Sequence, residues 1–431
     1  MTARELSATE PLTSSGMPAD VETRAPAAAP GARPEIGVTA ARGFVAGAAA
    51  CGVRPGPARL DVAVIFAEEP ASAAAVFTTN KVKAAPLVIS QLHLQRGMAR
   101  AVVINSGNAN ACTGSQGFRD ALLMAKLCAD ELDLDPSEVV VASTGVIGRL
   151  LPMDRVRRGI VDAVRARSAA GGADAAHAIM TTDTRAKEAC ARFQHHGRTV
   201  TVAGMAKGSG MIHVNMATML AFITTDAAVA PADLANVLGR CADGTFNMVT
   251  VDGDTSTNDM VLALANGASE TGQLTSGDGL EEFEAAFGAV CEGLARAIAS
   301  DGEGATRMFT VKVHRAADEQ QARRMARTVA SSNLVKAAVH GADPNWGRIV
   351  AALGRAGADL VLDRLQVTIG GHIVFRNGAG VSDLELGRVR DALAEKEVEI
   401  LCDIGLGEGH ARAFGCDLTP EYVHINADYT T

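Results

Sequence analysis

The sequence contains few aromatic residues, and this scarcity limits how its core can be built. Phe, Trp and Tyr together make up 3% of the 431 residues, with one tryptophan and two tyrosines, whereas hydrophobic residues make up 48%. A chain of this length and composition can bury a large core and is long enough for two or more domains. We therefore expect alanine, valine, glycine and leucine to do most of the packing, through close approach of neighbouring elements.

The sequence also lacks the segments that bring a chain to nucleic acid, to a membrane or into the secretory pathway. The formal net charge is −9 and no basic block is present, which excludes the usual electrostatic footprint of nucleic-acid binding. No uncharged apolar run reaches membrane-spanning length, so we expect no membrane partner. Residues 1–36 contain Glu5 and Asp20 but no apolar signal core; we expect a disordered tail and a cytoplasmic protein.

The spacing of ligands that is typical of a metal site is missing as well. The eight cysteines include no C-x-x-C pair, and most stand in apolar or alanine-rich stretches, which is typical of reduced cysteines in an intracellular core. A zinc site is the alternative, but its usual ligand spacing is absent. His195 and His196 are a tempting pair, yet adjacent residues point to opposite sides of a strand, and Gly197 predicts an exposed turn. We therefore expect no metal.

A glycine-rich approach to an apolar strand stands near the middle of the chain, in the segment MAKGSGMIHVNMATMLAFITTD (205–226). Gly208 and Gly210 allow sharp backbone turns. The run that begins at Thr218 is continuous, apolar and suited to a strand. A hydroxyl residue at the first position of a buried strand, after small residues, is the layout that an N-terminal threonine nucleophile needs. We therefore predict that cleavage between Ala217 and Thr218 frees such a nucleophile.

The chemistry of threonine explains why a free terminus would matter. A threonine hydroxyl is a weak nucleophile, and the free α-amine of Thr218 would supply the base that it requires. The reference pKa of that amine, about 7.7–8.0, leaves a useful fraction neutral near pH 7. The same hydroxyl can first attack the carbonyl of Ala217 and cut its own chain. The alternative is that Gly208, Gly210 and Thr218 mark only a loop and a strand start, since paired glycines are a weak signal.

Four further positions fit an acyl-transfer site. Thr144 and Gly145 end a strand-like run, where a backbone turn can aim an amide at an oxyanion; an ordinary turn between a strand and a helix is the alternative. Lys207 is the nearest cation before Thr218 and would pair with a substrate carboxylate. Glu303 would pair with a substrate amine. For Lys207 and Glu303 the alternative is a solvated surface charge.

Hydrophobic periodicity predicts an alternation of strands and helices along the chain. We expect strands at 60–67, 86–90, 101–106, 139–144, 218–225, 261–267 and 309–316, and a pair of strands within 188–206. We expect helices at 117–134, 154–168, 173–179, 231–243, 279–300 and 319–341. The last third of the chain continues this alternation, and we place a smaller second domain at roughly 310–410.

Several segments together resemble one protein family. They are KGSGMI and NMATMLAFITTDA around the predicted nucleophile, VFTTNKVKAAP (76–86), NSGNANACTG (105–114), STGVIG (143–148), IMTTDT (179–184), FNMVTVDGDTSTND (246–259), SDGEGATR (300–307), GADPNWGRI (341–349) and INADYTT (425–431). In this order they resemble the ornithine acetyltransferase (glutamate N-acetyltransferase) family of arginine biosynthesis, from about Gly37 to Thr431. Val214 and Ala186 depart from it, because the family usually has proline there; Val214 should leave the loop before the cleaved bond less pre-organised.

The resemblance implies an α/β fold, a layered sandwich in which helices cover stacked sheets, with a smaller C-terminal α/β domain. The domains that we expect are a main catalytic domain at 37–309, cleaved between 217 and 218, the smaller domain at 310–410, and a segment at 411–431 that folds back to the active site. The resemblance further implies that the two cleaved chains, α and β, stay associated in a heterotetramer or a larger assembly.

The resemblance also implies a role for each site residue. Thr218 is the nucleophile, and Thr144 and Gly145 form the oxyanion hole. The implied substrate contacts are Thr184, Lys207, Thr218, Glu303, Asn426 and Thr431. The implied reaction moves the acetyl group of the small-molecule donor N2-acetylornithine to glutamate through an acetyl-enzyme, with no cofactor or metal. Some family members also use acetyl-CoA as an acetyl donor, and the residues leave that question open.

Two other functions fit part of the pattern. An N-terminal threonine that transfers its acyl group to water would make the protein an amidase or aminopeptidase. A non-catalytic relative retained for binding is the second alternative. The intact Ala217-Thr218 pair, Thr144, Gly145 and Glu303 argue against a lapsed site.

Overall fold

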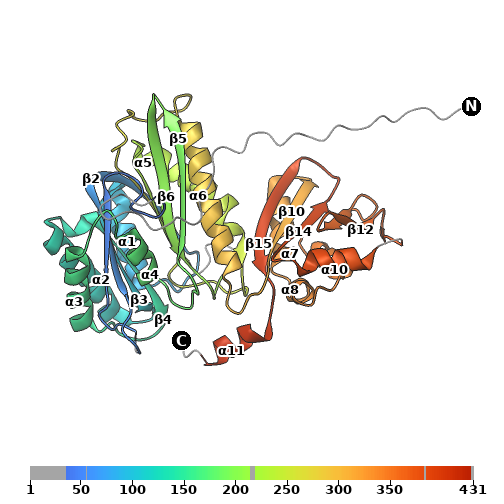
Figure 1. Cartoon of the computed structure of the whole chain (residues 1–431), viewed down its shortest axis with the longest axis horizontal. Helices are drawn as coiled ribbons and strands as arrows, with labels where there is room; N and C mark the ends of the chain where they lie inside the picture. The colour runs from blue at the N-terminus through green and yellow to red at the C-terminus, as the bar shows by residue number, and fades with distance from the viewer. Residues whose placement is uncertain (1–34, 55, 214–218, 383–384, 429–431) are drawn as a thin grey trace, which may run out of the picture.

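The computed structural model describes residues 35–54, 56–213, 219–382 and 385–428. Two lobes are visible in Figure 1: the larger holds most of the blue, green and yellow parts of the chain, and the smaller holds most of the orange and red parts. Each lobe is built on one sheet. The helix α11 (Pro420–Asp428) leaves the smaller lobe and runs back toward the larger one.

The sheet of the larger lobe comprises eight strands of the described chain, in the order β4-β3-β2-β9-β7-β6-β5, with β1 paired to β2. These strands are β1 (Phe44–Ala49), β2 (Val62–Phe77), β3 (Met98–Asn108), β4 (Val139–Val146), β5 (Lys187–His195), β6 (Arg198–Lys207), β7 (Leu220–Thr225) and β9 (Met260–Ala265). The long strand β2 joins two halves of this sheet. Its first part pairs mainly with β3 and its second part with β9, and a register irregularity lies between Phe66 and Ala71.

The two halves of this sheet pack face to face. Ile65 and Ile104 from one half lie in the same buried cluster as Phe222 and Leu262 from the other. Because side chains alternate along a strand, the neighbouring residues point outward, where α1, α2 and α3 cover the β2–β4 half and α5 and α6 cover the other half. The larger lobe is therefore a helix–sheet–sheet–helix sandwich.

The helices of the larger lobe follow the strands closely in sequence. They are α1 (Ala85–His93), α2 (Gly114–Leu132), α3 (Met153–Arg165), α4 (Gly172–Ala178), α5 (Pro231–Gly244) and α6 (Leu280–Ser300), with short 3-10 turns η1 (Leu94–Arg96), η2 (Pro136–Glu138) and η3 (Phe246–Met248). Across the described ranges, no helix has the length and apolar character that crossing a membrane requires.

The smaller lobe has one sheet with helices packed against it. In the described chain its strand order is β13-β12-β11-β14-β10-β15-β8. The strands are β8 (Val249–Thr250), β10 (Met308–Ala316), β11 (Gln366–Ile369), β12 (His372–Arg376), β13 (Ala379–Gly380), β14 (Glu397–Asp403) and β15 (Gly409–Cys416); the helices are α7 (Glu319–Ala330), α8 (Asn333–His340), α9 (Trp346–Gly354) and α10 (Leu386–Ala394). The expected domain boundary at 410 falls inside β15, and β8 comes from an earlier part of the chain and pairs in parallel with β15.

The expected fold class, a layered α/β sandwich with a smaller C-terminal α/β part, is confirmed by this arrangement of two sheets and their helices. Two predicted elements are wrong. Residues 86–90 form a helix, not a strand, because Pro86 is pre-organised for the first turn of α1 and a short apolar run does not distinguish the two structures. The helix predicted at 319–341 is broken into α7 and α8 at Ser331 and Ser332, where Ser332 has an extended backbone.

The prediction that His195 and His196 point apart is also wrong. Their rings stack with centroids 3.9 Å apart, and both face Asp278. The reason lies in the tight turn between β5 and β6, where His196 and Gly197 both have positive φ and the strand alternation no longer applies. None of the eight cysteines, all of which lie within the described residues, forms a disulfide, and six of them are buried, as predicted for reduced core residues.

Candidate active site

A pocket between the two halves of the large sheet and helix α11 brings together five of the residues that the sequence singled out. These five are Thr144, Gly145, Lys207, Glu303 and Asn426. They come from the ends of β4 and β6, from the loop after α6 and from α11, so they are far apart in the sequence and only the fold gathers them. The pocket therefore joins residues on both sides of the predicted cleavage position.

Lys207 is the cation of this pocket, and it is buried. Its Nζ donates a hydrogen bond to Thr181 Oγ1 at 2.7 Å and lies 3.4 Å from Thr144 Oγ1 and 3.9 Å from Asp183 Oδ2. Burial lowers the pKa of Lys207, and the nearby charge of Asp183 opposes that shift. The alternative of a solvated surface charge is wrong for Lys207, which is only 3% exposed.

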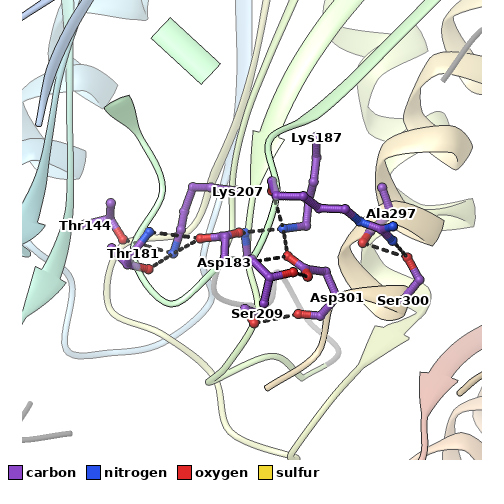
Figure 2. A network of polar contacts seen from close by, with 12 residues as sticks. Thr144, Thr181, Asp183, Lys187, Lys207, Ser209, Ala297, Ser300 and Asp301 are labelled. Atoms are coloured by element: carbon purple, nitrogen blue, oxygen red, sulfur yellow. Dashed lines mark hydrogen bonds and ion pairs between the residues drawn. The ribbon is translucent and has the colours of Figure 1, made fainter. Parts of the chain in front are cut away.

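A second buried lysine, Lys187, lies on the other side of Asp183 from the Lys207 ammonium (Figure 2). Lys187 Nζ lies 2.7 Å from Asp183 Oδ1 and 2.5 Å from Asp301 Oδ2, and all three side chains are buried. Burial alone would raise the pKa of Asp183, but the charges of Lys207 and Lys187 outweigh it and hold that pKa below its usual range. The backbone N–H of Gly208 also donates to Asp183 at 2.6 Å. Asp183 is therefore a carboxylate that compensates two buried ammonium groups.

Thr144 and Gly145 stand at the end of β4, beside the parallel strand β3. Thr144 is 4% exposed, and its hydroxyl faces the Lys207 ammonium (Figure 2). Gly145 has φ 131°, and a Cβ atom there would lie 2.4 Å from the carbonyl carbon of Gly107. Only glycine fits this close approach of β3 and β4. The hydroxyl and the backbone at this corner line the pocket, an arrangement that can face a developing oxyanion.

Buried asparagines hold the end of β4, which carries Thr144 and Gly145, in place. The sequence analysis missed this role. Asn258 Nδ2 donates to the carbonyls of Ala109 at 2.7 Å and Ser143 at 2.8 Å, which ties the loop before β9 to the strand that carries Thr144. Asn108 Nδ2 donates to the carbonyls of the loop after β4. The signal was present in the asparagine-rich segment 105–110 and in the polar run before β9, because buried amides are found where loop carbonyls need donors.

Glu303 connects the pocket to the C-terminal helix. Its Oε2 accepts a hydrogen bond from Asn426 Nδ2 at 2.8 Å, and its backbone N–H donates to the carbonyl of Ser209 at 2.9 Å. A Cβ atom at Gly210 would lie 2.3 Å from the Glu303 carboxyl group, so the glycine makes room for it. Glu303 is 9% exposed, which makes the solvated surface interpretation wrong here too. Thr431, the last expected contact, lies outside the described residues.

Thr184 is the one described candidate that the structure does not bring into the pocket. It is exposed, and its backbone N–H and hydroxyl donate to the carboxylate of Asp301. Thr181 and Thr182 line the pocket in its place. The sequence motif located a loop that lines the pocket, but the direction of each threonine depends on the turns around Asp183, which the motif alone does not determine.

Thr218, Ala217 and Val214 lie outside the described residues, but the chain on either side of them is held firmly. Before the segment, the backbone N–H groups of Met211 and Ile212 donate to Asp252 at 2.5 and 2.8 Å. After it, the backbone N–H of Met219 donates to Asp259 Oδ1 at 2.9 Å. The next residue, Leu220, pairs with Lys207 at the pocket edge of the sheet. The described residues on either side, up to His213 and from Met219 onward, are therefore held close to the pocket.

Substitution of Thr144 gives a first test of the oxyanion-binding role predicted for Thr144 and Gly145. Thr144→Ala is expected to lower kcat by about 10²–10³-fold with little change in KM, because an oxyanion donor acts mainly in the transition state. Thr144→Ser keeps the hydroxyl and is the matched control. Steady-state kinetics on both variants make the comparison; unchanged kcat with a raised KM would place Thr144 in substrate binding instead.

Comparison with known proteins decides the family. A model described as "ArgJ family" matches residues 45–431. The chain belongs to the ArgJ family. An arginine biosynthesis bifunctional protein ArgJ from Symbiobacterium thermophilum is 53% identical over 397 residues, covering 92% of this chain and 98% of that one, and its counterpart from Dehalococcoides mccartyi is 47% identical over 402 residues, covering 92% and 98%. The resemblance found in the sequence is thereby confirmed.

Solved structures of ArgJ-family proteins are also similar to this chain. The bifunctional protein argJ of Bacillus halodurans is 40% identical with a TM-score of 0.47, covering 48% of this chain and 98% of that one. Ornithine acetyltransferase from Mycobacterium tuberculosis, complexed with ornithine, is 42% identical with a TM-score of 0.40, covering 43% and 96%. The pocket residues of the ArgJ-family chain described above all lie within the range that the family model matches.

Proposed function

We propose that the protein transfers the acetyl group of N2-acetylornithine to glutamate, giving ornithine and N-acetylglutamate in arginine biosynthesis. The observation that carries this proposal is the pocket itself, in which a buried cation, Lys207, and a buried acid, Glu303, stand beside the corner formed by Thr144 and Gly145. Membership of the ArgJ family and relatives named as bifunctional arginine biosynthesis proteins support it.

The two buried charges match the two charged ends of an amino-acid substrate. The ammonium of Lys207 suits the α-carboxylate that the acetyl donor and the acceptor both carry. The carboxylate of Glu303, with the amide of Asn426 beside it, suits the side-chain ammonium of ornithine. Because the charges lie in a buried pocket, their attraction is screened less than it would be at the surface. Thr181 and Thr182 add hydroxyl groups at the same wall.

The chemistry that we propose is double displacement on Thr218. Its hydroxyl first attacks the carbonyl of Ala217, and the C–N bond breaks to leave an ester and a free α-amine; water then hydrolyses the ester, which restores the hydroxyl and leaves the amine as the base for later turnovers. The hydroxyl then attacks the acetyl carbonyl of the donor, the oxyanion forms at the corner of Thr144 and Gly145, and ornithine leaves with a proton. The amine of glutamate attacks the acetyl ester and regenerates the threonine. Every step uses groups of the chain, the substrates and water, so none requires a cofactor or a metal.

The proposal extends to acetyl-CoA as a second acetyl donor and to the association of the two cleaved chains. We propose glutamate N-acetyltransferase activity, with amino-acid N-acetyltransferase activity from acetyl-CoA as the second reaction, since the relatives above are named bifunctional. The α and β chains produced by cleavage stay together, in a heterotetramer or a larger assembly in the cytoplasm. The pocket supports their association because it combines residues from before and after position 217.

The test is a labelled donor and acceptor experiment. The purified protein is incubated with N2-acetylornithine labelled with ¹³C in the acetyl group, with and without glutamate, and the products are followed by mass spectrometry. We expect labelled N-acetylglutamate and ornithine in equal amounts, formed only when glutamate is present. Equal release of ornithine in the absence of glutamate would assign water as the acceptor and favour an amidohydrolase. Replacing the donor by labelled acetyl-CoA tests the second reaction separately.

A further inference from the structure

Three potential metal ligands meet at the tip of the hairpin formed by β5 and β6. His195 and His196 stand at the turn of this hairpin, and Asp278 comes from the loop before α6. Across the ranges that the structure describes, these three form the one group of His, Cys, Asp or Glu side chains whose potential ligand atoms all lie within 4.8 Å of one another. Rings that point apart were the reason to expect no metal at this pair, and the stacked rings remove that reason.

The distances within the group fit a shared ion better than they fit hydrogen bonds. The Nε2 atoms of His195 and His196 lie 3.5 and 3.2 Å from the same oxygen, Asp278 Oδ1. A charge-assisted hydrogen bond between a nitrogen and a carboxylate is shorter, about 2.7–2.9 Å. In a tetrahedral zinc site, ligand atoms bound at about 2.1 Å lie roughly 3.4 Å from one another. Both nitrogen–oxygen distances are close to that edge of the tetrahedron.

The protein around the group already holds the ligands near each other. The His195 ring lies over Gly279, where a Cβ atom would be 2.7 Å from the ring atom Cε1. Backbone hydrogen bonds of 3.1 and 2.9 Å between Thr275 and Asp278 close the loop that carries the carboxylate. The side chains of His196 and Asp278 are 60% and 52% exposed, so both can turn onto an ion while water reaches it from solvent. Little ordering therefore remains for an ion to impose.

The charges near the group also favour a cation. Arg198, the cation that follows the histidine pair in the sequence, is held by Glu270 at 2.6 Å. The carboxylate of Glu281 accepts the backbone N–H of Gly277, next to Asp278. Asp278 and Glu281 thus place two acidic groups on one short loop, and such a loop attracts positive ions.

The group lies far from the candidate active site. His195 and Lys187 stand at the two ends of the nine-residue strand β5, so they are roughly 26 Å apart. The turn between β5 and β6 is at the opposite end of the larger lobe from α11 (Figure 1). An ion bound at the turn therefore takes no part in acetyl transfer.

We propose that His195, His196 and Asp278 form a structural site for one zinc ion, with water as the fourth ligand. The ion links the β5–β6 turn to the loop that leads into α6, two segments far apart in the sequence. Two imidazoles and one carboxylate suit Zn²⁺. Mg²⁺ and Ca²⁺ prefer oxygen ligands, so the site discriminates against them.

Calorimetric titration of the untagged protein with ZnCl₂ tests the site. We expect one zinc ion per 44.4 kDa of protein. At free zinc about 100-fold above the dissociation constant, the thermal midpoint should rise by about 2–4 °C, because the ion binds only the folded protein. The same concentration of MgCl₂ should leave the midpoint unchanged.

His196→Ala and Asp278→Asn remove one ligand each. Both side chains are more than half exposed, so we expect both variants to fold with the midpoint that the wild type has without zinc. Each should bind zinc at least about 10-fold more weakly and lose the rise in thermal midpoint.

Two variants outside the group are the matched controls. His340→Ala removes an imidazole that faces a single carboxylate, that of Asp417, at 3.0 Å. Cys112→Ser removes the exposed thiol, which is the other type of zinc ligand on the surface. Both should bind zinc with the wild-type affinity.

Three results would overturn the proposal. The first is a wild-type protein whose dissociation constant for zinc is above roughly 1 mM. The second is equal zinc affinity in the wild type, His196→Ala and Asp278→Asn. The third is zinc binding that Cys112→Ser abolishes and the two ligand variants keep, which would assign the ion to the thiol.

Discussion

Thr218→Ala is expected to remain a single chain of 431 residues and to lose acetyl transfer by at least about 10³-fold, because the change removes both the nucleophile and the step that frees its base. Intact-mass measurement should find only the 44.4 kDa precursor. The wild type should instead yield a fragment that begins Thr-Met-Leu-Ala, which N-terminal sequencing identifies. A gel is a poor substitute, since the two pieces are nearly equal in length and run together.

Thr218→Ser is the control for this variant. Serine keeps the hydroxyl, so we expect the chain still to be cut and acetyl transfer to persist at a reduced rate. If Thr218→Ala is cut as efficiently as the wild type, the hydroxyl is not the agent of cleavage. If the wild type stays full length and still transfers acetyl groups at a normal rate, an N-terminal threonine is not the nucleophile.

Asp183→Asn is expected to have the largest effect on stability. The variant would leave the ammonium of Lys207 buried without its carboxylate and would remove one of the two acids that hold Lys187. Breaking a buried ion pair on one side typically costs about 3–5 kcal/mol. The free energy of unfolding at pH 7, measured by urea denaturation, should fall by about that amount. Acetyl transfer should fall as well, because Lys207 loses a charge that positions it.

Asp130→Asn is the matched control for the loss of a carboxylate. Asp130 is 54% exposed and pairs with Lys126 one helical turn away. We therefore expect the free energy of unfolding to change by less than about 1 kcal/mol. The pH dependence gives a second check. The pKa of Asp183 is lowered by folding, so its stabilisation is complete above the unfolded pKa of about 3.9 and is lost as the pH falls through the lower folded value. The difference in the free energy of unfolding between Asp183→Asn and the wild type should therefore persist at pH 7 and shrink only below about pH 4.

Sequence reasoning was strongest where the signal was local. Most helices and strands of the larger lobe were predicted close to their actual bounds, because their apolar periodicity is strong. It was weakest where a neighbouring segment decided the outcome. Pro86 began a helix where a short apolar run suggested a strand. The tight turn at His196 and Gly197 brought two rings together that strand alternation would separate.

The sequence by itself determined the family and the layered fold class, and it supplied the candidate site residues, because motifs and apolar periods are properties of the chain alone. Only the tertiary structure decided which residues meet. It placed Lys207 and Glu303 in one pocket and turned Thr184 away to Asp301. Burial is the physical reason: the pKa and the partner of a charged side chain depend on what the rest of the chain packs around it, and no spacing in the sequence records that.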